Sequence, residues 1–430
     1  MMWRTVSFVE RIEVEFKGNL FNQAMVLGDV DNDQRNELIV GNIDGDLAVF
    51  KGSNPVTCRK SSGLGIITCI GVGDICNQGK NNLVCLTAEG TCYLFDIKRE
   101  GESGLSEEDK VLKAAYKQEL PANSKVLLLA DIDGQTQLIV GYSDRVIRSF
   151  RWQSGSTSDG GEPYSTGQIV FVQKWKLAGQ TETISINKSS DGRQQVMASQ
   201  PGGTLVTLLR QTKDGDFHSD LSPNKLDGNT QDQRDTFLLY HPLGLSRAKN
   251  RDISTVIVGN INPGKQDLDH QTYYALATLD GTLVLAENDK ILWSLQVDHQ
   301  LFSLSKLDVT GNGKEEVVCC SWDGQTYIVN HSREVVRYLF QENVAAFSGG
   351  FYSLSEGGNI PCFIYATFNN TIYIYHNIKL PRVESTNLLQ VMDRTLETNQ
   401  LLAKLNIDPN RTDQLRELYH WCLYGWPTKS

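Results

Sequence analysis

Short runs of alternating hydrophobic and polar residues recur along most of the chain, separated by turns rich in Gly, Asp and Asn. Alternation over this length predicts β-strands rather than helices. The clearest unit spans residues 20–52 and contains an apolar run, an acidic loop that begins at Asp29, and two further apolar runs. The pair Asp44-Gly45 separates the last two runs and tolerates the positive φ angles of a tight hairpin. Each unit therefore contains at least one β-hairpin.

Seven copies of this unit follow one another along the chain. They occupy residues 20–52, 65–97, 124–152, 182–209, 252–285, 301–329 and 344–375. A fourth apolar run stands between copies, for example at 290–297 and 335–340. Four antiparallel strands per repeat form one blade of a β-propeller. The pattern predicts an all-β, seven-bladed propeller.

The stretch FVERIEVEF at residues 8–16 resembles these fourth runs, although no repeat precedes it. We expect it to pair with residues 371–375 of the last repeat and so supply that blade with its outer strand. This pairing would join the two ends of the propeller and leave no unpaired edge at the closure.

The period is lost after the seventh repeat. A first amphipathic helix is predicted from a cap at residues 385–387, and a second from Asp408-Pro409 to Gly425. We therefore predict two parts, a propeller at residues 1–383 and a short helical C-terminal tail at residues 384–430.

Composition narrows the choice of function. The chain is 40% hydrophobic and 21% charged, as in ordinary globular proteins, and its net charge is −10. This balance disfavours nucleic acid as a partner, because phosphate neutralisation needs clustered Lys and Arg. The first residues lack the apolar core of a signal peptide, and no apolar run reaches the length of a membrane span. We expect a cytoplasmic protein without membrane insertion, whose nine cysteines are free thiols.

Particular residues carry a family resemblance. Gly28-Asp-Val-Asp-Asn-Asp33 followed by Glu37-Leu-Ile-Val-Gly41 resembles the FG-GAP repeat of integrin α-chain propellers. With VDHQLFSLSKLDVTGNGKEEVV at 297–318 and WDGQTYIV at 322–329, the chain is similar to the integrin-alpha FG-GAP repeat-containing protein 2 family from about Val6 to Leu389.

The resemblance implies a function that the residues alone do not show. Members of that family belong to the KICSTOR complex, which helps to hold the GTPase-activating complex for Rag GTPases at the lysosome when amino acids are scarce. The chain would then be a scaffold subunit that restrains TOR growth signalling. It would join other protein subunits, including another propeller, and reach the lysosomal membrane through them.

The acidic loop of the first repeat is a candidate calcium site. Integrin-type loops of the form D-x-D-x-D-G-x-x-D place oxygen ligands at positions 1, 3, 5 and 9. Here Gln34 replaces the glycine at position 6, and acidic side chains could instead cap their own turn by accepting backbone N–H bonds. We favour capping and expect neither metal nor cofactor; the calcium alternative would use Asp29, Asp31, Asp33 and Glu37.

No catalytic constellation is evident in the sequence. The seven histidines share no motif, and no glycine-rich phosphate loop precedes a predicted helix. A noncatalytic scaffold is therefore the leading hypothesis; the alternatives are an extracellular adhesion-type propeller that binds calcium and a propeller hydrolase. Partner contacts are expected at exposed apolar residues of the propeller loops or of the tail helices, such as Leu388, Met392, Leu415 and Trp421.

Overall fold

A computed structural model gives the structure of the chain, which divides into two compact units at Met1–Leu380 and Pro381–Ser430. The structure describes residues 4–5, 10–53, 57–98, 110–155, 164, 167–188, 192, 194–209, 238–242, 252–264, 273–355, 358–378, 380, 396–405, 407–408 and 411–425.

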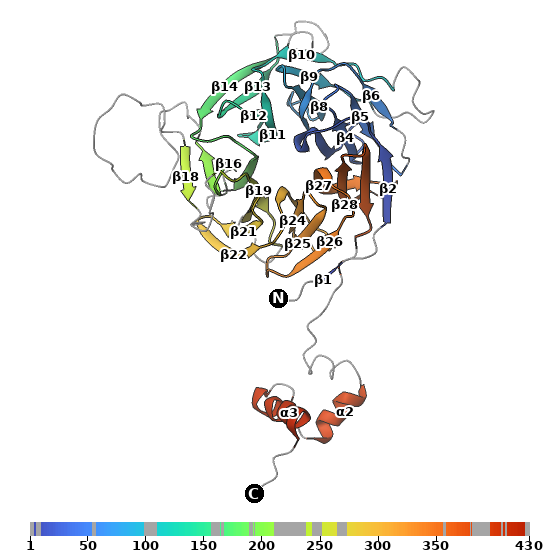
Figure 1. Ribbon diagram of the computed structural model, residues 1–430, viewed down its shortest axis with the longest axis vertical. Helices are drawn as coiled ribbons and strands as arrows, with labels where there is room; N and C mark the ends of the chain where they lie inside the picture. The colour runs from blue at the N-terminus through green and yellow to red at the C-terminus, as the bar shows by residue number, and fades with distance from the viewer. Residues whose placement is uncertain are drawn as a thin grey trace, which may run out of the picture. The chain divides into compact units, whose positions relative to one another are not determined.

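The first unit is a ring of seven antiparallel sheets, and the chain crosses each sheet from the inside of the ring to the outside (Figure 1). Blade one contains β3 (Met25–Gly28), β4 (Glu37–Gly41), β5 (Leu47–Phe50) and β6 (Arg59–Ser61). Blade two contains β7 (Ile67–Gly73), β8 (Asn82–Thr87), β9 (Thr91–Phe95) and β10 (Tyr116–Glu119). Blade three contains β11 (Ser124–Ile132), β12 (Gln135–Tyr142), β13 (Val146–Gln153) and β14 (Gln168–Lys176).

The remaining blades continue in the same order. Blade four contains β15 (Ile184–Lys188), β16 (Gln194–Gln200), β17 (Thr204–Leu208) and β18 (Leu238–Pro242). Blade five contains β19 (Thr255–Ile261), β20 (Tyr273–Thr278), β21 (Thr282–Glu287) and β22 (Lys290–Gln296). Blade six contains β23 (Leu301–Leu307), β24 (Glu316–Ser321), β25 (Gln325–Val329) and β26 (Val335–Leu339). Blade seven contains β27 (Val344–Ser353), β28 (Asn359–Thr367), β29 (Thr371–His376) and, on its outer edge, β2 (Glu10–Glu15).

The predicted seven-bladed propeller and its closure are confirmed. Strand β2 pairs antiparallel with β29, in a register that runs from Glu10 opposite His376 to Glu15 opposite Thr371. Figure 1 shows the blue β2 beside the dark orange strands of the last blade. Val14 of β2 is buried in a hydrophobic cluster that also contains side chains of blades seven and one. Burial of this strand therefore links the two ends of the ring.

Strand β1 (Arg4–Thr5), which pairs in parallel with β26, was not expected from the sequence. The fourth strands of blades one and four, β6 and β18, were implied by the four-stranded repeat, but their residues were not predicted. The loop of the third repeat, which is shorter than the others, forms a two-residue turn at Asp133-Gly134, both with positive φ.

The core of the propeller lies between neighbouring blades. Each sheet is covered on both faces, so the second and third strands are mostly buried; β4 and β24, for example, are buried along their whole length, including Glu37 and Glu316. All nine cysteines are free, and seven of them are buried in these layers.

The second unit contains the helices α2 (Leu396–Lys404) and α3 (Thr412–Tyr424), and a single-turn 3₁₀ helix, η1 (Asn22–Ala24), belongs to the first unit. The prediction that the last helix begins at Asp408-Pro409 is wrong. Arg411 has an extended backbone, so helical geometry begins after it, with Asp413 in the first turn where a negative charge is favourable. The predicted boundary at residue 384 and the first helical cap at 385–387 lie outside the described residues. No helix among the described residues is long and apolar enough to cross a membrane.

Candidate functional site

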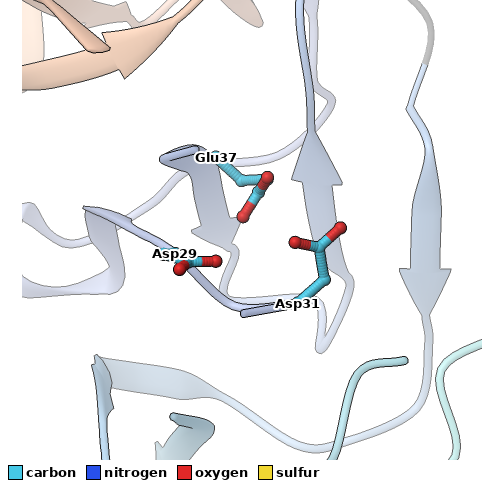
Figure 2. A group of neighbouring side chains, drawn as sticks. All are labelled: Asp29, Asp31 and Glu37. Atoms are coloured by element: carbon cyan, nitrogen blue, oxygen red, sulfur yellow. The ribbon is translucent and has the colours of Figure 1, made fainter. Parts of the chain in front are cut away.

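The acidic loop of blade one connects β3 to β4 and brings the predicted carboxylates together. Ligand atoms of Asp29, Asp31 and Glu37 lie within 4.8 Å of one another, and Figure 2 shows the three side chains facing a common space. The loop needs residues that accept left-handed backbone, and both Asn32 and Gln34 have positive φ. Gln34 occupies the position of the glycine in the calcium-loop pattern, and it adopts the positive φ that glycine would accept without strain.

Asp29 caps its own loop. Its Oδ1 accepts a hydrogen bond from the Asp33 backbone N–H at 3.0 Å, and its Oδ2 accepts one from the Gln34 N–H at 2.8 Å. Glu37 closes the other end, because its Oε2 accepts a hydrogen bond from the Val30 N–H at 3.0 Å. The backbone donors of the loop therefore occupy oxygen atoms that a calcium ion would otherwise use.

A lysine from the next strand reaches into the same loop. Lys51, directly after β5, places Nζ at 2.5 Å from Asp31 Oδ2, 2.7 Å from Asp33 Oδ2 and 2.9 Å from Glu37 Oε1. The exposed fraction of its side chain is 13%, and those of the three carboxylates are 6%, 0% and 1%. Arg35 adds a second cation at 2.6 Å from Asp33 Oδ2. The ammonium group of Lys51 stands where the loop would hold a metal ion.

The pKa shifts describe a network with more buried negative charge than positive charge. Burial raises the pKa of Glu37 to about 7, against the opposing hydrogen bond from Lys51. Burial also raises the pKa of Asp31. Burial would raise the pKa of Asp33 as well, but hydrogen bonds from Lys51 and Arg35 outweigh it and lower that pKa to about 2. Burial would lower the pKa of Lys51, but its three carboxylate partners raise it well above the ordinary value.

One oxygen atom of the cluster lacks a partner. Asp31 Oδ1 is buried and accepts no hydrogen bond from any residue that the structure describes. The oxygen atoms of the loop are nonetheless a poor calcium site, because a divalent cation bound there would have to displace the Lys51 ammonium group. The arrangement neutralises the buried carboxylates with the side-chain ammonium group of Lys51.

Two further blades repeat the capping without the lysine. Asp74 accepts the backbone N–H groups of Gln78 and Gly79, and Asp308 accepts those of residues 311–313. In blade six the buried Glu316 accepts the Val309 N–H at 2.9 Å, as Glu37 does for Val30. Turn capping, the interpretation favoured from the sequence, is thus observed for the first aspartate of all three loops.

Sequence reasoning missed Lys51, although a signal was present. Leu38 pairs with Phe50 across the β4–β5 hairpin, so the next positions outward, Glu37 and Lys51, lie opposite each other. Counting back from the Asp44-Gly45 turn would have placed the ammonium beside the acidic loop.

The four residues proposed for partner contacts are not brought together by the described structure. Leu388 and Met392 lie outside the described residues, as does the side chain of Leu415 in α3. Trp421 is described and its side chain is exposed. Large apolar side chains are also exposed at other positions of the two helices and directly after α2, namely Leu401, Leu405, Tyr419, Leu423 and Tyr424.

Comparison with known proteins gives matches along most of the chain. Residues 51–380 match the family model described as integrin-alpha FG-GAP repeat-containing protein 2. A mouse protein named KICSTOR complex protein ITFG2 is 44% identical over 441 aligned positions, which cover 98% of this chain and 96% of the mouse protein. A bovine protein of the same name is 42% identical, with coverage of 91% of this chain and 74% of the bovine protein.

Solved structures share the fold at low sequence identity. Two crystal structures of BBS1N in complex with ARL6DN, from crystals soaked with mercury and with lead, superpose with TM-scores of 0.56 and 0.57. Their identities to this chain are 13% and 14%, and the matches cover 87% and 90% of it and 99% of each solved chain. At this identity the likeness concerns the propeller fold alone.

Proposed function

Because the chain belongs to the integrin-alpha FG-GAP repeat-containing protein 2 family, we propose that it is a noncatalytic scaffold subunit of a KICSTOR-like complex. The observation that carries this proposal is the 44% identity to the mouse KICSTOR complex protein over nearly the full length of both chains. The match covers 98% of this chain and 96% of the mouse protein, so it extends over residues of both the propeller and the second unit.

The structure is consistent with a binding role. A closed propeller presents a preformed surface, which loses little ordering entropy when a partner docks. The most strongly perturbed carboxylates in the described residues, those of Glu37 and its neighbours, are engaged with Lys51 and with backbone amides rather than open to a substrate. This argues against a hydrolase that would use them as acid and base.

In cells, the chain then acts by bringing proteins together. It negatively regulates amino-acid-dependent TOR signalling, and other subunits, among them a second propeller, recruit it to the lysosomal membrane from the cytoplasm. The adhesion-type alternative requires calcium in loops such as that of blade one, where Lys51 already supplies the cation.

Purification of the tagged full-length chain under native, reducing conditions tests the proposal. We expect stoichiometric protein subunits, identified by mass spectrometry as relatives of KICSTOR proteins, and enrichment of the chain on isolated lysosomes after amino-acid withdrawal. Depletion of a co-purifying subunit should abolish the lysosomal enrichment. A chain that elutes as a free monomer from native extracts, with no stoichiometric partner, contradicts the proposal.

A further inference from the structure

One face of the propeller carries both the turns between second and third strands and the connections between blades. Because antiparallel strands alternate in direction, the turns between second and third strands emerge on the same face as the connections from one blade to the next. On this face, around blades six, seven, one and two, large apolar side chains are exposed. They are Phe21 (48% exposed), Ile43 (38%), Ile66 (40%), Trp322 (40%) and Phe368 (54%), called here the apolar arc.

Comparison of equivalent turns shows that the apolar arc is confined to part of the ring. The residue that precedes the turn pair is Trp322 in blade six, Phe368 in blade seven and Ile43 in blade one, and these blades are neighbours in the ring. The equivalent residues of blades two, three and four are small or cyclic, and that of blade five is half-buried: Ala88, Ser143, Pro201 and Leu279. Large exposed hydrophobic residues at the same turn position of three adjacent blades form a pattern, unlike the singly scattered hydrophobic residues of ordinary surfaces.

Backbone hydrogen bonds link the turns and connections that carry the apolar arc. The Val344 N–H donates to the Trp322 carbonyl, which ties the turn of blade six to the start of blade seven. Asn370, in the turn of blade seven, accepts from the Phe16 and Gly18 N–H groups of the connection that leads to Phe21.

The same pattern continues into blade one. The Ile43 N–H donates to the Asn19 carbonyl of that connection, and the Leu64 N–H donates to the Gly45 carbonyl, next to Ile66. The Trp322 ring is itself fixed, because it stacks on Phe302 with centroids 4.2 Å apart. The fold therefore holds the segments that carry the arc in fixed positions, so a partner would dock with little ordering of the backbone.

Carboxylates surround the apolar arc. The turns and connections that carry or adjoin the arc contain five acidic residues and one lysine, Lys17. These segments are residues 16–24, 42–46, 62–66, 87–91, 321–325, 340–343 and 367–371. The acidic residues are Asp44, Asp46, Glu89, Asp323 and Glu342. Such a surface repels phosphate-rich nucleic acid and anionic lipid and attracts basic groups.

We propose that the apolar arc is the docking surface for a protein partner whose contacting segment carries apolar side chains flanked by lysine or arginine, an inference that rests on the proposed scaffold function. Apolar anchors provide most of the affinity at such an interface, and the acidic rim provides orientation and rate of association. The partner is a subunit of the same complex, because the arc belongs to the propeller that the family shares.

Two pairs of substitutions test this surface in the purified complex. The double variant Phe368→Ser with Ile43→Ser removes apolar anchors, and its control is Phe171→Ser, which removes an equally exposed ring from the outer strand of blade three. The second test variant combines Asp44→Lys with Glu89→Lys and reverses two charges of the acidic rim. Its control is Asp131→Lys, which reverses a charge near the C-terminal end of β11, away from the face that carries the arc. Each variant is first required to melt within about 2 °C of the wild type.

The recombinant subunit that contacts the wild-type chain is titrated against each protein, and the complex is cross-linked with a carbodiimide. We expect both test variants to raise Kd at least about tenfold and both controls to leave it within about twofold. Cross-links should join Glu89, Asp323 or Glu342 to lysines of the subunit, and added salt should weaken association of the wild type more than of the charge-reversed variant.

Different failures have different meanings. A wild-type chain without any stoichiometric subunit overturns the proposed function and this surface with it. A complex in which both test variants bind as tightly as the wild type overturns the surface alone. The surface is also overturned if the same variants abolish self-association in ultracentrifugation, which would identify a second copy as the occupant, or if the chain by itself sediments with phosphatidylserine vesicles.

Discussion

At the scale of single residues, the acidic loop of blade one shows how one side chain can change the function expected of a sequence motif. Asp29, Asp31, Asp33 and Glu37 fit the spacing of a calcium loop, yet Lys51 contacts three of these carboxylates. Removing one partner of a buried ion pair leaves the other charge uncompensated, which costs more than the pair contributes. The loop should therefore depend on Lys51 for its stability.

Replacing Lys51 with Met keeps the apolar stem and removes the charge. We expect the free energy of unfolding to fall by about 3–5 kcal/mol in metal-free buffer, because Asp31 and Glu37 then lack their cation and Asp33 keeps only Arg35. Millimolar calcium should restore part of the loss in the variant and shift the melting temperature of the wild type by less than about 1 °C. Thermal unfolding with calcium and with a chelator measures both effects.

Lys80→Met in blade two is the matched control for this prediction. Lys80 pairs with Asp96, but both side chains are partly exposed, so the substitution should cost less than about 1 kcal/mol. A rise of several degrees in the wild-type melting temperature with micromolar calcium would show instead that the loop binds the ion while Lys51 is present.

A pH dependence follows from Glu37. Its pKa is about 7 in the folded chain and 4.5 when unperturbed, so between these values the folded state holds a proton that the unfolded state releases. The free energy of unfolding should therefore fall as pH rises from about 4.5 to 7, by about 2–3 kcal/mol, and then level off. Glu37→Gln removes this titration, and urea unfolding of both proteins at pH 5 and pH 8 isolates it as a difference. Equal pH dependence in the two proteins would contradict the assignment.

At the scale of elements, the closure of the ring and the tight turns control stability. Strand β2 brings the start of the chain to the outer edge of the last blade, and its Val14 and the following Phe16 are buried between blades seven and one. Each buried side chain of this kind contributes roughly 1.5–3 kcal/mol. The turn between second and third strands is packed against the next connection, which leaves room for little more than glycine at some positions.

Deletion of residues 1–16 should therefore lower the free energy of unfolding by about 3–6 kcal/mol and promote aggregation through the exposed edge of β29. Deletion of residues 1–9 is the control, since it removes β1 and keeps β2. Chemical unfolding and light scattering distinguish the two truncations. Similar stability of both proteins would mean that β2 does not hold the ring closed.

Gly324 tests the turn geometry. Its φ is +85°, and a Cβ there would lie 2.2 Å from the Phe340 carbonyl oxygen. Gly134 also has positive φ, +76°, but no atom of the described residues lies within 4 Å of the point where a Cβ would stand. Gly324→Ala should thus destabilise the propeller by at least about 2 kcal/mol more than Gly134→Ala, which bears only the conformational cost. Equal losses in urea unfolding would show that the connection yields to the added methyl group.

At the scale of the whole molecule, two surfaces are proposed for partners, one on the propeller and one on the helices of the second unit. In that unit Leu402 and Leu418 are buried, whereas Trp421 and several neighbouring side chains are exposed. The helices form a compact unit of their own, so changes to exposed positions there should not alter the melting of the blades.

Replacing Leu388, Met392, Leu415 and Trp421 with Glu should break complex formation and leave the main melting transition unchanged. Leu402→Glu serves as the contrast, because it buries a charge and should unfold the helices. Circular dichroism and native purification report folding and assembly separately. Intact assembly of the quadruple variant would place all essential contacts on the blades.

The sequence by itself determined the strands, the number of blades and the closure of the ring. These features depend on local alternation and hairpin turns, which each repeat encodes independently, and on an unpaired strand at residues 8–16 that only the last blade could use. The repeat implied a fourth strand in every blade, but the residues of β6 and β18 were not predicted; β6 consists of Arg59, Lys60 and Ser61 and has no apolar residue to mark it.

Only the tertiary structure decided what the conspicuous residues do. It placed Lys51 among the carboxylates of a loop that otherwise resembles a calcium site, so the loop must be interpreted with its own cation. It also placed Phe368 and Ile43, which come from opposite ends of the propeller sequence, in turns of adjacent blades. Ring closure brings blades seven and one side by side, and a surface that spans this junction has no counterpart in any continuous stretch of sequence.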